Sequence, residues 1–376
     1  MKVSFLLGSR GEWGYIRPII AELSRRGHDP SIYAVNMAVL GAYGQLATEI
    51  AAEGYPVTNR LLTAISGDSH AAMAKSVALT TSVVADVLMN DRPDWFVLAG
   101  DRAEQLGAAV AASYTYTPTA HVQAGERSGN IDDTARHAIA RLVHVHFASN
   151  LDAAERLIRS GESESRVFIS GAPQLDDLLN DPLPTRDDLG ARRLVPREEY
   201  LLACLHPVTE NLADLEKSTG VMIDVLEERS EPKVWILPNN DPGGELIRQL
   251  VLGRRRSSDF VHTNLVRTDY LGVMKHAKAL VGNSSSGILE APSLGLCVVN
   301  VGERQRDRVR GRNVIDVDFE PAEIANALER ASSVAFVRSL EGMENPYGDG
   351  LSSSRIVSTL EEIRVDQALL AKRLAF

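Results

Sequence analysis

The feature that most constrains the fold is a repeated alternation between short apolar segments and longer amphipathic ones. The short segments are bounded by turn residues and have the length and composition of buried strands. Expected strands lie at 3–7, 31–35, 95–98, 119–122 and 145–148, and again at 200–205, 233–237, 279–281, 297–301 and 314–317. Amphipathic helices are expected between them, as in the spacing of Ile16, Ile19 and Leu23. The sequence therefore predicts an α/β protein with doubly wound parallel sheets.

One segment, 181–197, interrupts this alternation, because it carries three prolines among charged residues and is typical of an interdomain linker. A chain of 376 residues also exceeds one ordinary hydrophobic core. We therefore expect an N-terminal Rossmann-like domain at 1–180, a linker at 181–197, a second Rossmann-like domain at 198–353, and a C-terminal helix within 354–376. Two such domains would face each other across a cleft, where ligands usually bind.

The composition excludes several classes of partner. A net charge of −10 is unfavourable for binding a phosphate backbone, so nucleic acid is not expected. The two cysteines, Cys204 and Cys297, lie in apolar segments, which argues against a disulfide framework and against a thiolate metal site. The N-terminus shows no leader pattern, and no window is expected to reach the length of a membrane span. These features predict a cytoplasmic protein without a membrane partner.

Two strand ends in the first half carry polar residues. The strand at 3–7 is followed by GSRGEWG at 8–14, which is either a tight turn or a loop that contacts a phosphate or sugar, with Arg10 favouring contact. The strand at 95–98 leads into Asp101 and Arg102. Side chains at the carboxyl ends of parallel strands point toward the ligand crevice, although Asp101 could instead cap the next helix.

The next strand end carries acidic residues. Gln123 and Glu126 follow the strand at 119–122, and Asp132, Asp133 and Arg136 lie at the start of the following helix. Carboxylates gathered in this way suit general acid–base chemistry, with Asp101 on the neighbouring strand. Two histidines at 144 and 146 share one face of a strand, where packing is a better interpretation than metal binding.

In the second half, His206 ends the strand at 200–205 and could bond a phosphate or exchange protons near neutral pH. The sequence GNSSSG at 282–287 places Ser284, Ser285 and Ser286 before a helix that contains Glu290, which favours a phosphate cradle over a simple helix cap. Five arginines, including Arg304, alternate at 304–312. We expect most of them to be solvated or paired, with one or two able to reach a diphosphate.

Taken together, these segments resemble the UDP-N-acetylglucosamine 2-epimerase family, and specifically its hydrolysing branch. The strongest stretches are GE at 125–126, IDDTARHAI at 131–139, HPVT at 206–209 and GNSSSG at 282–287, with RQ at 304–305 and GRNV at 311–314. The resemblance covers most of the chain. Because several spaced motifs occur in the same order, it is more specific than any one motif.

The resemblance implies a GT-B fold, a homodimer, and no metal or other cofactor. It implies that UDP is held by Arg10, Arg102, His206, Asn239, Ser284, Ser285, Glu290 and Arg304. It also implies that Asp101 and Asp132 are catalytic carboxylates anchored by Arg136. The implied reaction breaks the anomeric C–O bond, releases UDP, removes the C2 proton and adds water to give a C2-epimerised sugar, of the kind used in sialic-acid-type pathways.

Three departures from the family pattern affect this expectation. Gln123 stands where the family carries a catalytic glutamate, Ala99 where a histidine is frequent, and Asp307 where a glycine is frequent. A neutral amide cannot exchange a proton with the sugar, so Glu126, Asp132 or Asp133 would have to do so. The alternatives are a nucleotide-sugar hydrolase that does not invert C2, a GT-B glycosyltransferase, and a non-catalytic nucleotide-sugar sensor.

Overall fold

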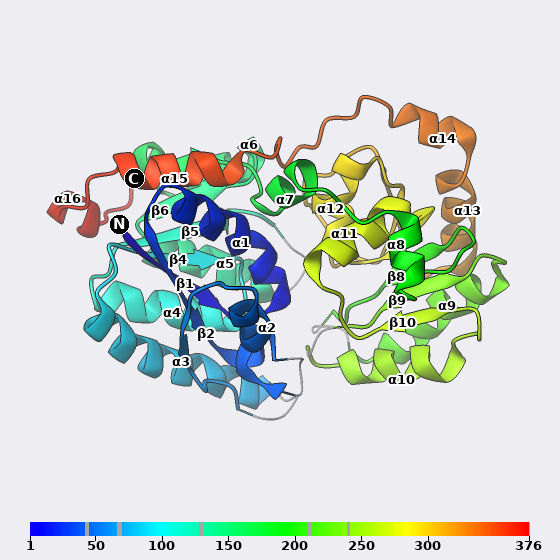
Figure 1. Ribbon diagram of the computed structural model, residues 1–376, viewed down its shortest axis with the longest axis horizontal. Helices are drawn as coiled ribbons and strands as arrows, with labels where there is room; N and C mark the ends of the chain where they lie inside the picture. The colour runs from blue at the N-terminus through cyan, green and yellow to red at the C-terminus, as the bar shows by residue number, and fades with distance from the viewer. Residues whose placement is uncertain (42–44, 66–69, 128–130, 209–211, 239–240, 376) are drawn as a thin grey trace. The chain divides into compact units, whose positions relative to one another are not determined.

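The structure is a computed structural model that describes residues 1–41, 45–65, 70–127, 131–208, 212–238 and 241–375 (Figure 1). The chain forms two compact units. Unit 1 comprises Met1–Glu126, Asp132–Asp177 and Tyr347–Phe376, and unit 2 comprises Arg127–Ile131 and Leu178–Pro346. The chain therefore leaves the first unit twice and returns to it each time.

Unit 1 is built on a parallel seven-stranded sheet. Its strands are β1 (Lys2–Leu7), β2 (Asp29–Ala34), β3 (Val57–Arg60), β4 (Trp95–Ala99), β5 (Thr119–Ala124), β6 (Val145–Ala148) and β7 (Val167–Ile169). Its helices are α1 (Arg10–Arg25), η1 (Asn36–Val39), α2 (Leu46–Ala52), α3 (His70–Asp91), α4 (Ala103–Tyr114), α5 (Ile131–Leu142), α6 (Leu151–Arg159), η3 (Glu164–Arg166), α15 (Ser352–Glu362) and α16 (Gln367–Leu370), and α7 (Gln174–Asn180) leads into unit 2.

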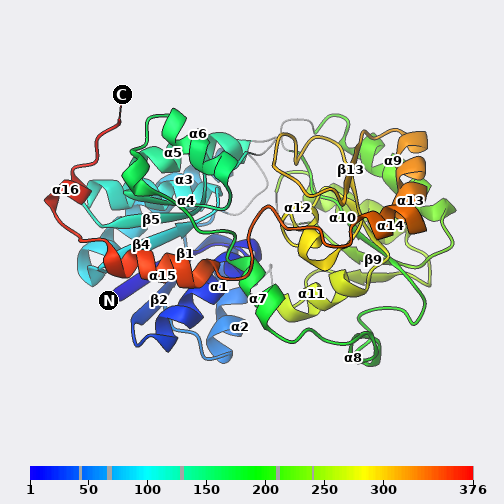
Figure 2. The same ribbon diagram turned by 90° about the horizontal axis from the view of Figure 1, so that it is seen from above.

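Helices cover both faces of this sheet (Figures 1 and 2). Along β1, Val3 and Phe5 pack with α1 and α15, whereas Leu6 packs with α3 and α4, because successive side chains of a strand point to opposite faces. The strand order is β3-β2-β1-β4-β5-β6-β7. The order reverses between β1 and β4, and such a reversal opens a ligand crevice at the carboxyl ends of the two strands.

Unit 2 repeats the plan with a parallel six-stranded sheet. Its strands are β8 (Leu201–Cys204), β9 (Lys233–Ile236), β10 (Phe260–His262), β11 (Ala279–Gly282), β12 (Val298–Val301) and β13 (Val314–Val317). Its helices are α8 (Arg186–Ala191), α9 (Leu215–Glu228), α10 (Gly244–Arg254), α11 (Arg267–His276), α12 (Ser286–Leu289), η4 (Ala291–Leu294), α13 (Pro321–Ala331) and α14 (Val334–Ser339). The order β10-β9-β8-β11-β12-β13 reverses between β8 and β11.

Two helical predictions need correction. The segment expected as a linker contains α8, which is started by a capping box between Thr185 and Asp188. The single C-terminal helix expected within 354–376 is two helices, because α15 ends at Glu362 and the side chain of Asp366 caps a new helix, α16. Local caps thus place both boundaries.

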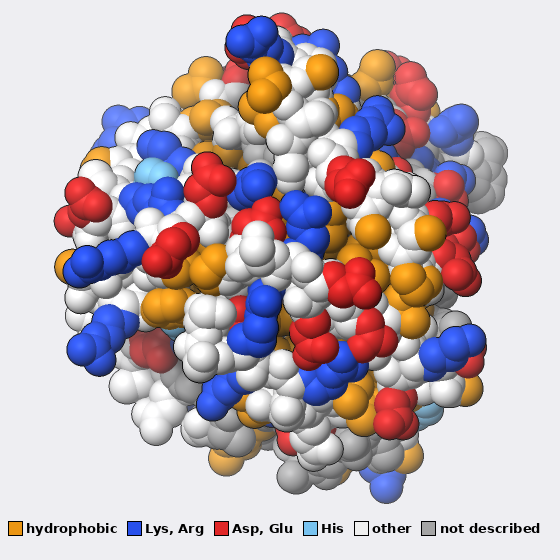
Figure 3. All heavy atoms as spheres, turned by 90° about the vertical axis from the view of Figure 1, so that its right-hand side faces the viewer, with side chains coloured by type: hydrophobic (Ala, Val, Ile, Leu, Met, Phe, Trp, Pro, Cys, Tyr) orange, Lys and Arg blue, Asp and Glu red, His pale blue; other side chains and the backbone are white. Residues whose placement is uncertain are grey.

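The surface in Figure 3 shows acidic and basic side chains interspersed with apolar ones. Opposite charges also form ion pairs in unit 2, where Arg254 pairs with both Asp224 and Glu227. As far as the described residues show, the face in view carries mixed charge and not one continuous basic patch.

The expectation that no segment reaches the length of a membrane span is wrong. The 22-residue helix α3 is long and apolar enough to cross a membrane by length and composition alone, with a mean hydropathy of 1.4. Within unit 1 this helix packs along α4, where Gly107 lets the backbone of Val77 approach closely and Thr81 donates a hydrogen bond to the Gly107 carbonyl (3.0 Å). Only 22% of the most apolar 18-residue stretch of α3 is buried, so the helix leaves an exposed apolar face.

Candidate active site

The turn between β1 and α1 is closed by its own acidic residue. The Glu12 carboxylate accepts hydrogen bonds from the amides of Gly8 (2.5 Å) and Ser9 (3.2 Å), and Ser9 completes a capping box. These two amides are therefore already engaged. The guanidinium of Arg10 pairs with Glu49 (2.7 Å) and is 28% exposed, so it is the cationic group that this turn offers to a ligand.

Behind this turn, two carboxyl groups are buried together. Burial and the neighbouring Glu104 carboxylate raise the pKa of Glu12 well above its usual value. Glu104 is itself buried and accepts hydrogen bonds from Arg102 (3.2 Å) and Asn36 (3.0 Å). The pair thus fixes the direction of the Arg102 side chain at the carboxyl end of β4.

Arg136 contacts two of the acidic residues predicted near β4 and β5, Asp101 through its carboxylate and Glu126 through its backbone carbonyl. This buried guanidinium forms an ion pair with Asp101 and donates a hydrogen bond to the carbonyl of Glu126 (2.9 Å). Asp132 and Asp133 lie in the first turn of α5, and His137 one turn later is 3.8 Å from Asp133. The structure therefore brings Asp101, Glu126 and Arg136 into one cluster, with two more carboxylates one turn of helix or less from Arg136.

Gln123 lies within unit 1 at a β-bulge. Its backbone has a positive φ of 63°, and the β5–β6 register shifts between Val122 and Ala124. The buried side chain accepts a hydrogen bond from Ser149 (2.8 Å) and donates one to Gln174 (3.1 Å). Both ends of the amide are thus engaged with neighbouring side chains.

Several supporting residues were missed by the sequence analysis. His121 on β5 is fully buried and bonds the carbonyl of Gly100 (2.6 Å), which fixes the turn that presents Asp101. Burial lowers the pKa of His121 to about 3, so the imidazole stays neutral at physiological pH. Asn150 donates to the Glu126 carboxylate (2.8 Å). A histidine or an asparagine gives no local signal of such contacts, because both are made between segments distant in sequence.

The two histidines of β6 pack inside unit 1, which agrees with the packing interpretation. His146 bonds Glu162 (2.9 Å), and the Glu162 carboxylate also pairs with Lys372 (2.7 Å). His144 accepts a hydrogen bond from the amide of Thr119 (3.1 Å). Burial lowers the pKa of each histidine to about 4, so both are neutral structural groups at physiological pH.

In unit 2, the ends of β8 and β11 are joined by a reciprocal pair of hydrogen bonds. Asn283 accepts from the amide of His206 (2.7 Å) and donates to the His206 carbonyl (2.9 Å). Arg304 and Gln305 both donate to the Asn283 carbonyl (3.1 and 3.0 Å). The predicted residues His206 and Arg304 therefore both contact Asn283, at the point where the strand order reverses.

The serine loop lies beside this pair. Ser284 is buried and its hydroxyl donates to Ser286 (3.3 Å), while Ser285 and Ser286 are partly exposed. The following helix α12 has only four residues, so its dipole adds little to the charge at this loop. Glu290 is buried and pairs with Arg267 (2.9 Å), a residue that the sequence analysis did not identify. The predicted Asn239 lies outside the described residues.

The arginine loop is largely paired, in line with the prediction. Arg306 pairs with Glu303, and Arg310 with Asp316. Arg308 donates to Gln305 (3.1 Å). Among the arginines of this loop, Arg304 donates a hydrogen bond to the Asn283 carbonyl at the end of β11.

Comparisons with known proteins identify a family for this chain. The family model described as UDP-N-acetylglucosamine 2-epimerase matches residues 41–361. A Legionella pneumophila protein named UDP-N,N'-diacetylbacillosamine 2-epimerase (hydrolyzing) is 33% identical over 374 residues, covering 99% of this chain and 98% of that protein. A Neisseria meningitidis UDP-N-acetylglucosamine 2-epimerase is 31% identical over 335 residues, covering 89% of this chain and 88% of that protein.

Solved structures show the same fold. The N. meningitidis UDP-GlcNAc 2-epimerase bound to UDP-GlcNAc aligns with a TM-score of 0.82 at 19% identity, covering 96% of this chain and 100% of that chain. The Methanocaldococcus jannaschii enzyme in complex with UDP-GlcNAc and UDP aligns with a TM-score of 0.80 at 20% identity, covering 96% and 99%. The predicted α/β fold class with GT-B-like architecture is confirmed. By its sequence motifs, its family match and its full-length relatives, the chain belongs to the UDP-N-acetylglucosamine 2-epimerase family.

Proposed function

We propose that this protein is a hydrolysing nucleotide-sugar 2-epimerase that converts UDP-GlcNAc, or a related UDP-2-acetamido sugar, to UDP and the free C2-epimerised sugar. The observation that carries the proposal is the cluster of Asp101, Glu126 and Arg136 in a chain whose full-length relative at 33% identity is named as a hydrolysing 2-epimerase. That relative's name also makes UDP-N,N'-diacetylbacillosamine a substrate to test.

In this proposal unit 2 holds the nucleotide. Six of the predicted residues lie at or near the carboxyl ends of β8 and β11, namely His206, Ser284, Ser285, Ser286, Glu290 and Arg304. Asn239, which lies outside the described residues, is also proposed to bind the nucleotide. Hydroxyls, amides and one arginine suit a diphosphate, and a carboxylate such as Glu290 accepts hydrogen bonds from sugar hydroxyls. Arg10 and Arg102 of unit 1 are proposed as further nucleotide-binding residues, as the family resemblance implies.

The carboxylates of unit 1 would carry out the chemistry. The anomeric C–O bond breaks and UDP leaves with the bonding electrons, while a carboxylate takes the C2 proton to give a glycal-like intermediate. Water then adds its oxygen to C1, and a carboxylic acid delivers a proton to the opposite face of C2, so that substrate and water are converted to UDP and epimer. Asp101, Glu126, Asp132 and Asp133 are the candidate acids and bases, and Arg136 anchors Asp101 and the Glu126 backbone.

Gln123 supports one competing function. Its amide exchanges no proton and both of its ends are engaged by Ser149 and Gln174. A site that lacks a base against C2 would hydrolyse the sugar–phosphate bond and release the sugar with its original configuration. The carboxylates near Arg136 favour epimerisation, because they supply the acid and base that Gln123 does not.

The proposal is tested by incubating the purified protein with UDP-GlcNAc and, separately, with UDP-N,N'-diacetylbacillosamine. We expect release of UDP together with a free sugar of inverted C2 configuration from at least one of them. A free sugar of unchanged configuration would support the hydrolase. Failure to release UDP from either substrate would contradict the proposal.

The proposal includes a cytoplasmic homodimer, with α3 at the interface. Ala71, Ala74, Ala78 and Ser82 give the exposed face of α3 a small-residue surface that permits close helix packing. Lys75 and Asp86 are also exposed and lie on either side of the helix midpoint. An antiparallel second copy related by a twofold axis would place Lys75 of each copy against Asp86 of the other.

A charge at the centre of this face should separate the dimer. Leu79 is 36% exposed, and Leu79→Glu would place two like charges near the twofold axis. Light scattering after size exclusion should show a dimer for the wild type and a monomer for Leu79→Glu. Leu252→Glu, at a residue 40% exposed in unit 2, is the matched control and should remain dimeric. A monomeric wild type, or wild type that binds lipid vesicles instead of itself, would contradict this interface.

A further inference from the structure

The Glu126 carboxylate is held by two donors from other parts of unit 1. Glu126 is 2% exposed, and its two oxygens face different partners. Oε1 accepts from the Asn150 amide nitrogen (2.8 Å), and Oε2 faces the Tyr347 hydroxyl (3.4 Å). Both of these partners are neutral donors, and together they fix the orientation of the carboxylate.

The orientation of the Asn150 amide is set by a second contact. Its Oδ1 accepts from the backbone amide of Ala153 and caps α6 (2.9 Å). The NH₂ group must therefore point the other way, toward Glu126. The side chain cannot flip without losing both hydrogen bonds, which makes Asn150 a rigid support.

Tyr347 is the first residue of unit 1 after the chain returns from unit 2 at Pro346. Its side chain is fully buried, and its backbone carbonyl accepts from the amide of Ala172 (2.7 Å). The next residue, Gly348, packs closely against Gly171. A Cβ atom added to Gly348 would lie 3.2 Å from the Cα atom of Gly171. These contacts tie the phenol to unit 1 at the point of return.

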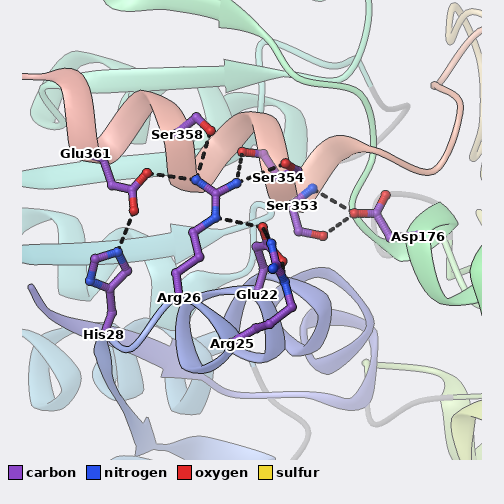
Figure 4. Close-up of polar contacts among 9 residues, drawn as sticks. All are labelled: Glu22, Arg25, Arg26, His28, Asp176, Ser353, Ser354, Ser358 and Glu361. Atoms are coloured by element: carbon purple, nitrogen blue, oxygen red, sulfur yellow. Dashed lines mark hydrogen bonds and ion pairs between the residues drawn. The ribbon is translucent and has the colours of Figure 1, made fainter.

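The helix that follows Tyr347 is fastened at both ends (Figure 4). At its start, the Asp176 carboxylate accepts from the amides of Ser352 (3.0 Å) and Ser353 (2.7 Å). Toward its end, Glu361 bonds Arg26 (2.7 Å) and His28 (2.7 Å) of the α1 region. The return segment is therefore a fixed part of unit 1 and holds the Tyr347 phenol in place.

We propose that Tyr347 and Asn150 are positioning residues for the Glu126 carboxylate, so that the C-terminal return segment completes the acid–base site of unit 1. This inference rests on the proposed function. A carboxylate that exchanges a proton with carbon must be held in one geometry, because a small displacement of a reacting group costs a large factor in rate. Neither Tyr347 nor Asn150 needs to touch the reacting atoms.

The variant Tyr347→Phe tests this, because it keeps the buried ring and removes only the hydroxyl. We expect kcat to fall roughly tenfold while KM for the UDP-sugar changes by less than about twofold, since the substrate contacts are kept. A merely structural tyrosine would lower the melting temperature and leave kcat unchanged.

Tyr200→Phe is the matched control. Tyr200 is also fully buried, and its hydroxyl donates to the Val273 carbonyl (2.7 Å) within unit 2. It should lose comparable thermal stability and keep the wild-type kcat. Equal effects of the two variants on kcat would overturn the positioning role.

Two further measurements separate this inference from the proposed function. Glu126→Gln should lose most of its kcat, and full activity of that variant would overturn the inference while leaving the epimerase intact. A crystal structure of Tyr347→Phe should show the Glu126 carboxylate displaced or in two rotamers. If the wild type turns over no UDP-sugar, the proposed function fails. The crystal structure of Tyr347→Phe then tests the positioning role by itself. A displaced Glu126 carboxylate would support that role, and an unmoved one would overturn it.

Discussion

Arg136→Met is expected to lower the free energy of unfolding by about 3 kcal/mol and to reduce turnover by a factor of at least ~100. The Arg136 side chain is 5% exposed and the Asp101 side chain 20% exposed, so methionine would leave a largely buried carboxylate without its counter-ion. The same change removes the donor to the Glu126 carbonyl. Urea unfolding measures the first effect, and UDP release from a UDP-2-acetamido sugar measures the second.

Arg141→Met is the matched control for this prediction. Arg141 lies on the same helix and pairs with the buried Glu162 (2.8 Å), so its loss should also destabilise the fold. Its kcat should stay close to that of the wild type, because Glu162 belongs to the His146 cluster. The double variant Asp101→Asn with Arg136→Met should recover part of the stability and none of the activity. A kcat of Arg136→Met within threefold of the wild type would show that the cluster is not part of the chemistry.

Gly282→Ala is expected to cost at least ~4 kcal/mol or to prevent folding of unit 2, with loss of UDP binding. Gly282 ends β11 with a φ of 129°, and a Cβ atom there would lie 2.0 Å from the backbone oxygen of Cys204. The strand ends would have to separate where His206 and Asn283 exchange their hydrogen bonds. Urea unfolding and calorimetric titration with UDP measure the two effects.

Gly295→Ala provides the comparison within the same unit. Gly295 also has a positive φ, of 61°, but a Cβ atom there would meet nothing within 4 Å. Only the intrinsic cost of the left-handed conformation remains, which is about 1 kcal/mol. Equal stability losses in the two variants would show that the close approach of β8 and β11 does not determine the stability of unit 2.

The strands inside each sheet could be predicted from sequence, as could the edge strand β13, whereas the other edge strands of the described sheets could not. The segments expected at 95–98 and 314–317 correspond to β4 and β13, and the buried strands on either side of each reversal were all identified. The edge strands β3, β7 and β10 were missed because they have three or four residues and half-exposed side chains. Continuous apolar runs mark only strands that are covered on both faces.

Part of the candidate site could likewise be predicted from sequence and part could not. Asp101 and Glu126 were predicted to cluster because each follows a parallel strand, and the family resemblance implied that Arg136 anchors the cluster. In the structure Arg136 pairs with Asp101 and bonds the Glu126 carbonyl. The residues that orient them, such as His121 and Tyr347, could not be predicted. Tyr347 lies 221 residues from Glu126 in sequence, and contacts of this kind depend on tertiary packing.

The most direct test of the epimerase account is proton NMR of the reaction in D₂O. We expect release of UDP and a free 2-acetamido sugar with inverted C2 and deuterium at that carbon, because the proton is removed and replaced from solvent. The Glu126→Gln variant should give little or no deuterated product under the same conditions. A wild-type product that retains its C2 proton and its original configuration would contradict epimerisation and identify a simple hydrolase.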